Sequence, residues 1–323
     1  MIYDCFTFFN ELDLLEIRLN ILNDIVDKFV IVEMNKTFTG ENKSLYYQEN
    51  KARFNKFDGK IIHVIVDDCP ETDNAWALEN YQRNCISRGL KNCQSDDIIM
   101  ISDLDEIPNP EIIANLDCSS DIYLLEQKMY YYFLNYLNIK SPIWYSGTKV
   151  LSYQNFLHGL DNIDVKYSKF MPEEQNSGTT ANKIRHFGDA KYIKNGGWHF
   201  SYLGGVDMII KKIKSFSHQE FNKAEYTNKD LILKRIASGK DIFNRSGCLY
   251  VPVSLDNSFP EYLVNNQEKY KFLIFQMTIW DKLKSYLKIY WCTVMKFLYY
   301  KEKINTQRKI YILGVKMFSY NKN

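Results

Sequence analysis

The segment Asp97–Pro110 constrains the fold more than any other part of this 323-residue chain. It places an apolar run, Ile98–Ile101, directly before three carboxylates, those of Asp103, Asp105 and Glu106, and it ends in prolines. An unbroken apolar run of this kind is typical of a strand that is buried on both faces of a parallel sheet. The carboxylates then lie at the carboxyl end of that strand, the edge at which open α/β sheets bind ligands.

Three acidic groups within four positions repel one another unless a cation or a proton neutralises them. Oxygen ligands suit Mg²⁺ or Mn²⁺, and these ions commonly bridge to the phosphates of a substrate. The pattern therefore predicts that Asp103 and Asp105 hold a divalent metal ion beside a nucleotide diphosphate. A D-x-D pair also occurs in loops, where aspartate makes local hydrogen bonds, so the motif alone leaves both roles open.

The first hundred residues alternate between strand and helix patterns. Strands are expected over residues 2–9, 28–33, 60–66 and 98–102, and helices over residues 12–22, 46–57 and 75–90. This βαβα order predicts an α/β fold with a mostly parallel, Rossmann-like central sheet flanked by helices. The chain has no G-x-G-x-x-G and no G-x-x-x-x-G-K motif, so neither a dinucleotide-binding fold nor a P-loop enzyme is supported.

The pattern changes after Pro110. We expect aromatic strands over 122–137, a strand over 144–151, a polar loop over 159–182, short strands over 184–187 and 198–202, and a helix from residue 206. The catalytic body is predicted to end near residue 265. The chain then divides into a domain of residues 1–265 and a tail of residues 266–323.

The tail is basic and aromatic. Residues 271–323 carry eleven Lys and Arg against two acidic residues, a net charge of +9, which leaves −7 for the rest of a chain whose total is +2. Residues 270–300 predict an amphipathic helix whose apolar runs are broken by lysines, so no spanning helix of about 20 uncharged residues is available. We expect this helix to bind an anionic membrane surface; alternatively it packs on the body or forms a dimer.

The cysteines and the N-terminus bear on the compartment. Seven cysteines, an odd number, include no C-x-x-C pair and no zinc-ligand spacing, which favours free thiols in a reducing compartment. The segment Met1–Phe9 lacks the basic region and the cleavage site of a signal peptide. We therefore expect a cytoplasmic protein that is peripheral on the inner face of the cell membrane.

Four segments follow one another along residues 1–250: IYDCFTFFNELDLLEIRL, DKFVIVEMNKTFTG, SDLDEIP and GGWHFSYLGGVD. In them the chain resembles glycosyltransferase family 17, which includes the animal β-1,4-N-acetylglucosaminyltransferases that add a bisecting residue, and many bacterial members. The resemblance implies a GT-A fold, a UDP-sugar donor, dependence on Mn²⁺ or Mg²⁺, and inversion at the sugar carbon. It leads us to expect transfer of N-acetylglucosamine or a related hexose to a glycan or lipid-linked oligosaccharide in bacterial surface polysaccharide or lipopolysaccharide synthesis.

The residues agree with this chemistry. A metal ion that bridges both phosphates stabilises the negative charge on the departing diphosphate as a Lewis acid. Asp103 and Asp105 are the expected ligands, although Asp103 alternatively faces the ribose. His199 follows a glycine pair that allows close backbone approach, and it is the candidate for a further ligand. The alternative is a histidine that is hydrogen-bonded in the core beside Trp198.

Four residues besides Asp103 are expected to bind the nucleotide sugar. Asn10 and Glu11 follow the first strand, Glu33 ends the second, and Arg83 lies on the helix after the third, so all four approach the same carboxyl edge of the sheet. The planar fork of Arg83 suits a diphosphate or a base. Glu11 is alternatively a first-turn carboxylate that the helix dipole favours.

An inverting transfer requires a carboxylate that accepts the proton of the acceptor hydroxyl. Asp207 is the first candidate because it begins the helix after Gly204 and Gly205, and Glu126, on the aromatic strand, is the second. Asp207 is alternatively only the cap of its helix.

Trp144 and Trp198, together with Trp76, are candidates for stacking on sugar rings, although large aromatic side chains more often pack in a core. Two functions of other classes remain open at this stage. One is a non-catalytic, membrane-associated carbohydrate-binding protein. The other is a metal-dependent phosphohydrolase or nuclease, whose basic tail would bind nucleic acid; on the preferred interpretation no nucleic acid is bound.

Overall fold

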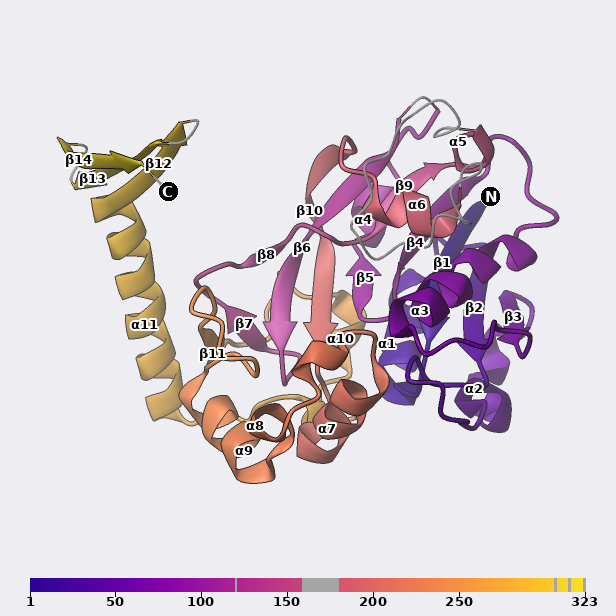
Figure 1. Ribbon diagram of the computed structural model, residues 1–323, viewed down its shortest axis with the longest axis horizontal. Coiled ribbons are helices and arrows are strands. Elements are labelled where there is room, and N and C mark those ends of the chain that lie inside the picture. The colour runs from indigo at the N-terminus through magenta and orange to yellow at the C-terminus, as the bar shows by residue number, and fades with distance from the viewer. Residues whose placement is uncertain (120, 159–179, 305–306, 313–314, 322–323) are drawn as a thin grey trace.

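The computed structural model describes residues 1–119, 121–158, 180–304, 307–312 and 315–321. One large sheet runs through the body (Figure 1). Its strands are β1 Ile2–Phe8, β2 Lys28–Met34, β3 Ile61–Val66, β4 Ile98–Asp103, β5 Glu106–Pro108, β6 Tyr123–Tyr131, β7 Tyr136–Asn138, β8 Ile143–Trp144, β9 Lys149–Ser152, β10 Lys191–Ser201 and β11 Tyr250–Pro252.

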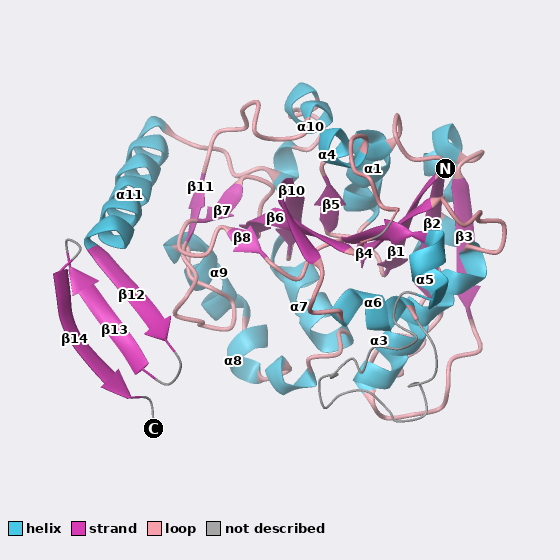
Figure 2. Ribbon diagram, turned by 90° about the horizontal axis from the view of Figure 1, so that it is seen from above, coloured by secondary structure: helices cyan, strands magenta, loops and turns pink. Residues whose placement is uncertain are grey.

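Helices cover both faces of this sheet. The α-helices of the described residues are α1 Leu12–Leu22, α2 Tyr46–Glu49, α3 Ala75–Asn84, α4 Pro110–Ile113, α5 Tyr153–His158, α6 Ala181–His186, α7 Gly205–Ser215, α8 Ala224–Thr227, α9 Lys229–Ser238, α10 Glu261–Asn265 and, in the tail, α11 Ile279–Leu298. Seen along the sheet, α1, α4 and α10 lie on one side and α3 and α6 on the other (Figure 2). Side chains of β1 alternate between two hydrophobic cores: Phe6 and Phe8 pack in the first core, and Tyr3 and Cys5 pack in the second.

The strand order is β11-β7-β6-β9-β4-β1-β2-β3, with β10 paired to β5 and β6, and β8 paired to β6. The strands β1 to β4 pair in parallel, as does β10 with β6, whereas β9 is antiparallel to β4 and β6. The α/β prediction is confirmed, but the sheet is mixed rather than mostly parallel. The connections among β6, β8 and β9 are too short for the crossovers that parallel pairing requires.

The order in which successive strands are added to the sheet reverses between β1 and β4. Strands β2 and β3 lie on one side of β1, and β4 lies on the other, with Thr7 opposite Asp103 in the β1–β4 register. Open α/β sheets bind ligands in the crevice outside the carboxyl ends of the strands at such a switch point. The fold therefore brings the residues that follow β1 and β4 together.

One predicted strand is a helix. Residues 184–187 were expected to be extended, but residues 181–186 form α6. The N-cap residue of α6 is Thr180, whose side chain accepts a hydrogen bond from the Lys183 amide at 3.2 Å. This N-cap stabilises the first turn, and the helix directs Arg185 into the sheet edge. The predicted polar loop falls mostly on residues 159–179, outside the described residues.

The tail is helical only in part. Helix α11 extends away from the body (Figure 1), and it is followed by an antiparallel sheet of β12 Tyr299–Ile304, β13 Gln307–Ile312 and β14 Val315–Asn321. Within the described part of the chain, no helix is both long enough and apolar enough to cross a bilayer. The packed body continues past residue 265, since Tyr270 and Leu273 are buried in the first core.

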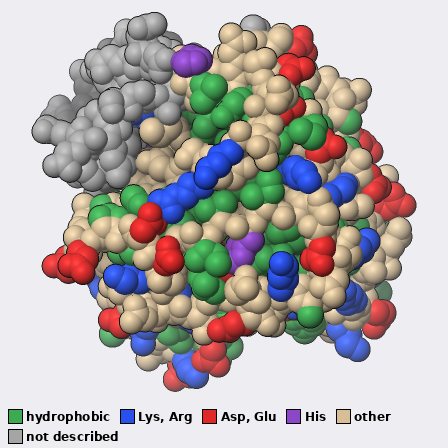
Figure 3. Space-filling view, turned by 90° about the vertical axis from the view of Figure 1, so that its right-hand side faces the viewer, with side chains coloured by type: hydrophobic (Ala, Val, Ile, Leu, Met, Phe, Trp, Pro, Cys, Tyr) green, Lys and Arg blue, Asp and Glu red, His purple; other side chains and the backbone are tan. Residues whose placement is uncertain are grey.

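The surface at the β3 edge carries mixed charge. In Figure 3 acidic and basic side chains are interspersed there, with hydrophobic groups between them. Among the side chains drawn in colour, this face forms no broad patch of one sign of the kind that would attract a polyanion.

Candidate active site

A cavity of about 500 Å³ lies at the switch point of the sheet. Its walls come from the turn after β1, the segment after β2, helices α3 and α7, the β4–β5 turn, and strands β6 and β10. Its size is in the range of pockets that bind small organic ligands. Asp103, Asp105, Glu106 and His199 all line it.

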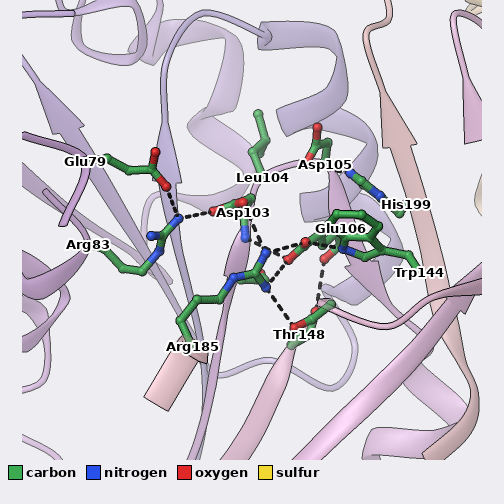
Figure 4. A network of polar contacts seen from close by, with 12 residues as sticks. Glu79, Arg83, Asp103, Leu104, Asp105, Glu106, Trp144, Thr148, Arg185 and His199 are labelled. Carbon is green, nitrogen blue, oxygen red and sulfur yellow. Dashed lines mark hydrogen bonds and ion pairs between the residues drawn. The ribbon is translucent and has the colours of Figure 1, made fainter. Parts of the chain in front are cut away.

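Asp103 is held between two arginines (Figure 4). Arg83 Nη2 lies 2.8 Å from Oδ1, and Arg185 Nη2 lies 3.2 Å from Oδ2. Burial raises the pKa of Asp103, but the charges of Arg185 and Arg83 outweigh burial and lower the pKa to about 2. Arg83 is itself held by Glu79 at 3.0 Å. The Asp103 carboxylate is therefore ionised and fixed in orientation at the cavity wall.

Glu106 is a structural carboxylate. Arg185 donates two hydrogen bonds of 2.6 Å to it, one to each oxygen, and Trp144 Nε1 donates a third at 2.7 Å. The Asp103 backbone amide donates to Oε2 at 3.1 Å. Because Glu106 is buried and these donors occupy both of its oxygens, it fixes the β4–β5 turn rather than offering itself to a ligand.

Asp105 faces two different groups. Lys212 Nζ lies 2.9 Å from Oδ2, while His199 Nε2 lies 3.4 Å from Oδ1. Burial raises the pKa of Asp105, yet Lys212 and His199 outweigh it, so the pKa lies far below its usual range. His199 is buried beside Trp144, with ring centroids 4.7 Å apart, and its Nδ1 has no hydrogen-bond partner among the described residues.

These groups fit a divalent ion whose coordination shell is completed by a substrate. Asp105 and His199 present one oxygen and one nitrogen toward each other, and Asp103 lies on the same cavity wall. The described residues contain no group of three or more His, Cys, Asp and Glu side chains close enough to enclose a metal ion. Mg²⁺ in nucleotide sites usually takes one or two carboxylates and completes its shell with phosphates and water, which matches this partial set.

The structure brings some of the predicted nucleotide residues to the cavity. Glu11 and Arg83 line it, and Asn10 lines a small hollow beside it together with Glu11. Glu33 does not line the cavity: it is fully buried, accepts the Tyr47 amide hydrogen bond at 3.0 Å, and lies 3.0 Å from His63 Nε2. We therefore withdraw Glu33 as a nucleotide ligand, because its oxygens anchor α2 to the sheet.

Neither predicted base lines the cavity. The Asp207 side chain is 82% exposed and pairs with Lys229 at 2.6 Å on the outer surface of α7. On β6, Met129 and Tyr131 line the cavity. Because side chains alternate along a strand, Glu126 lies on the opposite face. Both assignments are corrected for this geometric reason.

The tryptophans divide in the same way. Trp144 and Trp76 line the cavity, and Trp76 packs edge-on against His218 with ring centroids 4.5 Å apart. Trp198 does not reach the cavity: it is buried in the first core and donates from Nε1 to the Ser258 carbonyl at 3.0 Å. The prediction that Trp198 stacks on a sugar is thus corrected to a core role.

Sequence reasoning missed Arg185, which pairs with the cavity residue Asp103, and Lys212, which lines the cavity. Arg185 lay in the segment that was predicted as a strand. Lys212 lies on α7 between the buried side chains of Ile209 and Ile213, and a lysine within the apolar face of a helix is a signal that could have identified it.

Comparisons with known proteins identify the family of the chain. The sequence profile of glycosyltransferase family 17 matches residues 1–277. Two similar relatives are the β-1,4-mannosyl-glycoprotein 4-β-N-acetylglucosaminyltransferases of Rattus norvegicus and Homo sapiens, each 25% identical over 82% of this chain and 53% of the relative. The chain therefore spans about half the length of these relatives. A crystal structure of HddC from Yersinia pseudotuberculosis shares 12% identity over 60% of this chain and 89% of that one, with a TM-score of 0.32.

Proposed function

The chain belongs to glycosyltransferase family 17, and from this premise we propose that it transfers a sugar from a UDP-sugar to a hydroxyl group of a glycan. The observation that carries the proposal is the meeting of Asp103, Asp105 and His199 at one cavity at the switch point of the sheet. The names of the relatives support N-acetylglucosamine or a related hexose as the sugar.

The cavity walls divide the work of donor binding. Asp105 and His199 would hold Mn²⁺ or Mg²⁺, which, when bound, neutralises charge on the diphosphate as a Lewis acid. Asp103 is fixed by Arg83 and Arg185, so it is pre-oriented to accept hydrogen bonds from the ribose. We place the nucleotide across the turn after β1, where Glu11 lines the cavity.

The acceptor is proposed to be a glycan or a lipid-linked oligosaccharide of bacterial surface polysaccharide or lipopolysaccharide synthesis, with inversion at the transferred carbon. Trp144 offers an aromatic face beside His199, and aromatic rings of this kind pack well against the apolar face of a sugar.

The proposal is tested by calorimetric titration of UDP with and without Mn²⁺, followed by a screen of UDP-sugars for release of UDP. We expect binding that requires the cation, and loss of both binding and turnover in Asp105→Asn. Asp207→Asn is the matched control, because it makes the same change on the exposed surface. A protein that hydrolyses phosphate esters but ignores UDP would be a phosphohydrolase. One that binds glycans without turnover would be a carbohydrate-binding protein.

We also propose that the protein lies on the cytoplasmic face of an anionic membrane through α11. Helical spacing places Ile279, Leu283, Leu287 and Tyr290 on one face of this helix, and all four are exposed, the isoleucine at 79%. Lys284 lies beside this stripe, in a tail segment whose net charge is +9. Apolar side chains with lysines at their margin suit the interface of a bilayer that carries negative charge.

This placement is tested by co-sedimentation with phosphatidylserine vesicles at low and high salt. We expect binding by the full chain, weaker binding at high salt, and a clear loss in the variant Leu283→Ser/Leu287→Ser. Leu233→Ser is the control, since Leu233 is 53% exposed on a different helix, α9. A full chain that ignores the vesicles contradicts the placement.

A further inference from the structure

Lys212 is a charged residue of the cavity, in direct contact with Asp105, that the proposed function has not yet used. It lies on α7, and its ammonium group sits between two carboxylates, 2.9 Å from Asp105 Oδ2 and 3.4 Å from Glu11 Oε1. It also lies over the ring of Tyr202, 5.4 Å from the centroid. A lysine ammonium group is charged at neutral pH, and here two carboxylates face that charge.

The two oxygens of the Asp105 carboxylate face different partners. One carboxylate oxygen faces His199 and the other faces Lys212. A ligand held at the His199 side of Asp105 therefore comes within a few ångströms of the ammonium group. An ammonium group has three N–H donors, and the two carboxylates leave one of them for a ligand.

The other nearby cations are less available. The guanidinium of Arg83 is tied to Asp103 and Glu79, and that of Arg185 is tied to Asp103 and Glu106; their side chains are only 3% and 7% exposed. The Lys212 side chain is 28% exposed and lines the cavity. Lysine binds phosphate as a point charge on a flexible side chain. Lys212 is therefore a cation beside Asp105 whose ammonium group can move to contact a diphosphate.

We propose that Lys212 is a catalytic residue that binds the diphosphate of the donor and stabilises the negative charge that develops on the leaving UDP. This role rests on the proposed function. In the transfer, the bond between the sugar carbon and the β-phosphate oxygen breaks and its electron pair stays on that oxygen. The acceptor oxygen bonds to the same carbon, and its hydroxyl proton passes to water. Lys212 remains protonated throughout and donates a hydrogen bond to the diphosphate.

The test compares UDP with uridine, which lacks phosphates, by NMR titration of the wild-type protein and of Lys212→Met, with Mg²⁺ present in every titration. A hydrogen bond to a charged group contributes about 1.5–3 kcal/mol, so UDP should bind roughly 10- to 100-fold more weakly to the variant. Uridine affinity should not change. Lys214→Met, an exposed lysine on the same helix that does not line the cavity, should behave as the wild type. Lys212→Arg should recover part of the affinity for UDP and part of kcat.

The outcomes separate the two proposals. If the wild type binds UDP and Lys212→Met binds it equally well, the role of Lys212 is overturned and the donor assignment stands. If UDP and uridine weaken together, Lys212 only holds α7 in place, which also overturns the role. A wild type that binds no UDP overturns the donor assignment and this role with it. Lys212→Gln, which keeps a polar end group without the charge, repeats the measurement if the Met variant melts early.

Discussion

Arg185→Met should destabilise the protein strongly, although Arg185 lies on a helix of only six residues. Its guanidinium makes two bonds of 2.6 Å to Glu106, one of 2.8 Å to the Gly147 carbonyl, and an ion pair of 3.2 Å with Asp103. Without it, the Glu106 carboxylate stays buried with only Trp144 and a backbone amide as donors. Removing one partner of a buried ion pair typically costs about 3–5 kcal/mol of unfolding free energy.

This loss can be converted into a melting temperature. An unfolding entropy of about 2.1 cal/mol/K per residue gives roughly 0.6–0.7 kcal/mol/K for a chain of this length, so the variant should melt about 4–8 °C below the wild type. The matched control is Arg88→Met. Arg88 pairs with Asp68 at 2.8 Å, but the two side chains are 34% and 55% exposed, and such surface pairs contribute about 1 kcal/mol at most. Its shift should stay below about 2 °C.

Circular dichroism melting and urea titration at pH 7 would measure both variants. Adding Glu106→Gln to Arg185→Met removes the unpaired buried charge, so the double variant should melt above the single one. The reasoning is refuted if Arg185→Met melts no lower than Arg88→Met, or if neutralising Glu106 lowers stability further in the Arg185→Met background.

Three further predictions follow from the described contacts. The pKa of Asp103 is lowered from 3.8 to about 2 in the folded state. Its contribution to stability is therefore present above pH 3.8 and is lost as the pH falls toward 2. Between pH 5 and pH 2.5, the urea midpoint of unfolding should fall less in Asp103→Asn than in the wild type. Asp207→Asn should leave kcat within about twofold, far from the 10²–10⁴-fold loss of a general base, and a larger loss in a UDP-release assay would return Asp207 to the reaction. Gly197 has φ +141°, and a Cβ there would meet the Ile107 carbonyl at 2.1 Å. Gly197→Ala should therefore lower the unfolding free energy by about 1–3 kcal/mol. The control is Gly59→Ala, whose Cβ would meet no atom within 4 Å and which should change the unfolding free energy little in the same melting assay.

The local pattern of the chain predicted most elements of the N-terminal half. The helix expected over 12–22 has those bounds in the structure, and the strands expected from residues 2, 28 and 98 begin there. The spacing of apolar residues predicts buried strands and amphipathic helices, and this prediction requires no knowledge of distant partners. The same spacing failed at residues 184–187, where an N-cap and a buried arginine favour a helix.

By itself the sequence determined which residues follow the carboxyl ends of the parallel strands, and so Glu11, Arg83, Asp103 and Asp105 could be expected at one edge. Only the tertiary structure decided what those residues meet. Arg185 reaches Asp103 across 82 positions of the chain, and Lys212 reaches Asp105 across 107. Local spacing specifies periodicity, whereas the order of strands in the sheet and the packing of distant helices specify neighbours. For that reason Arg185 and Lys212, and the side of the sheet on which each predicted residue lies, emerged only with the fold.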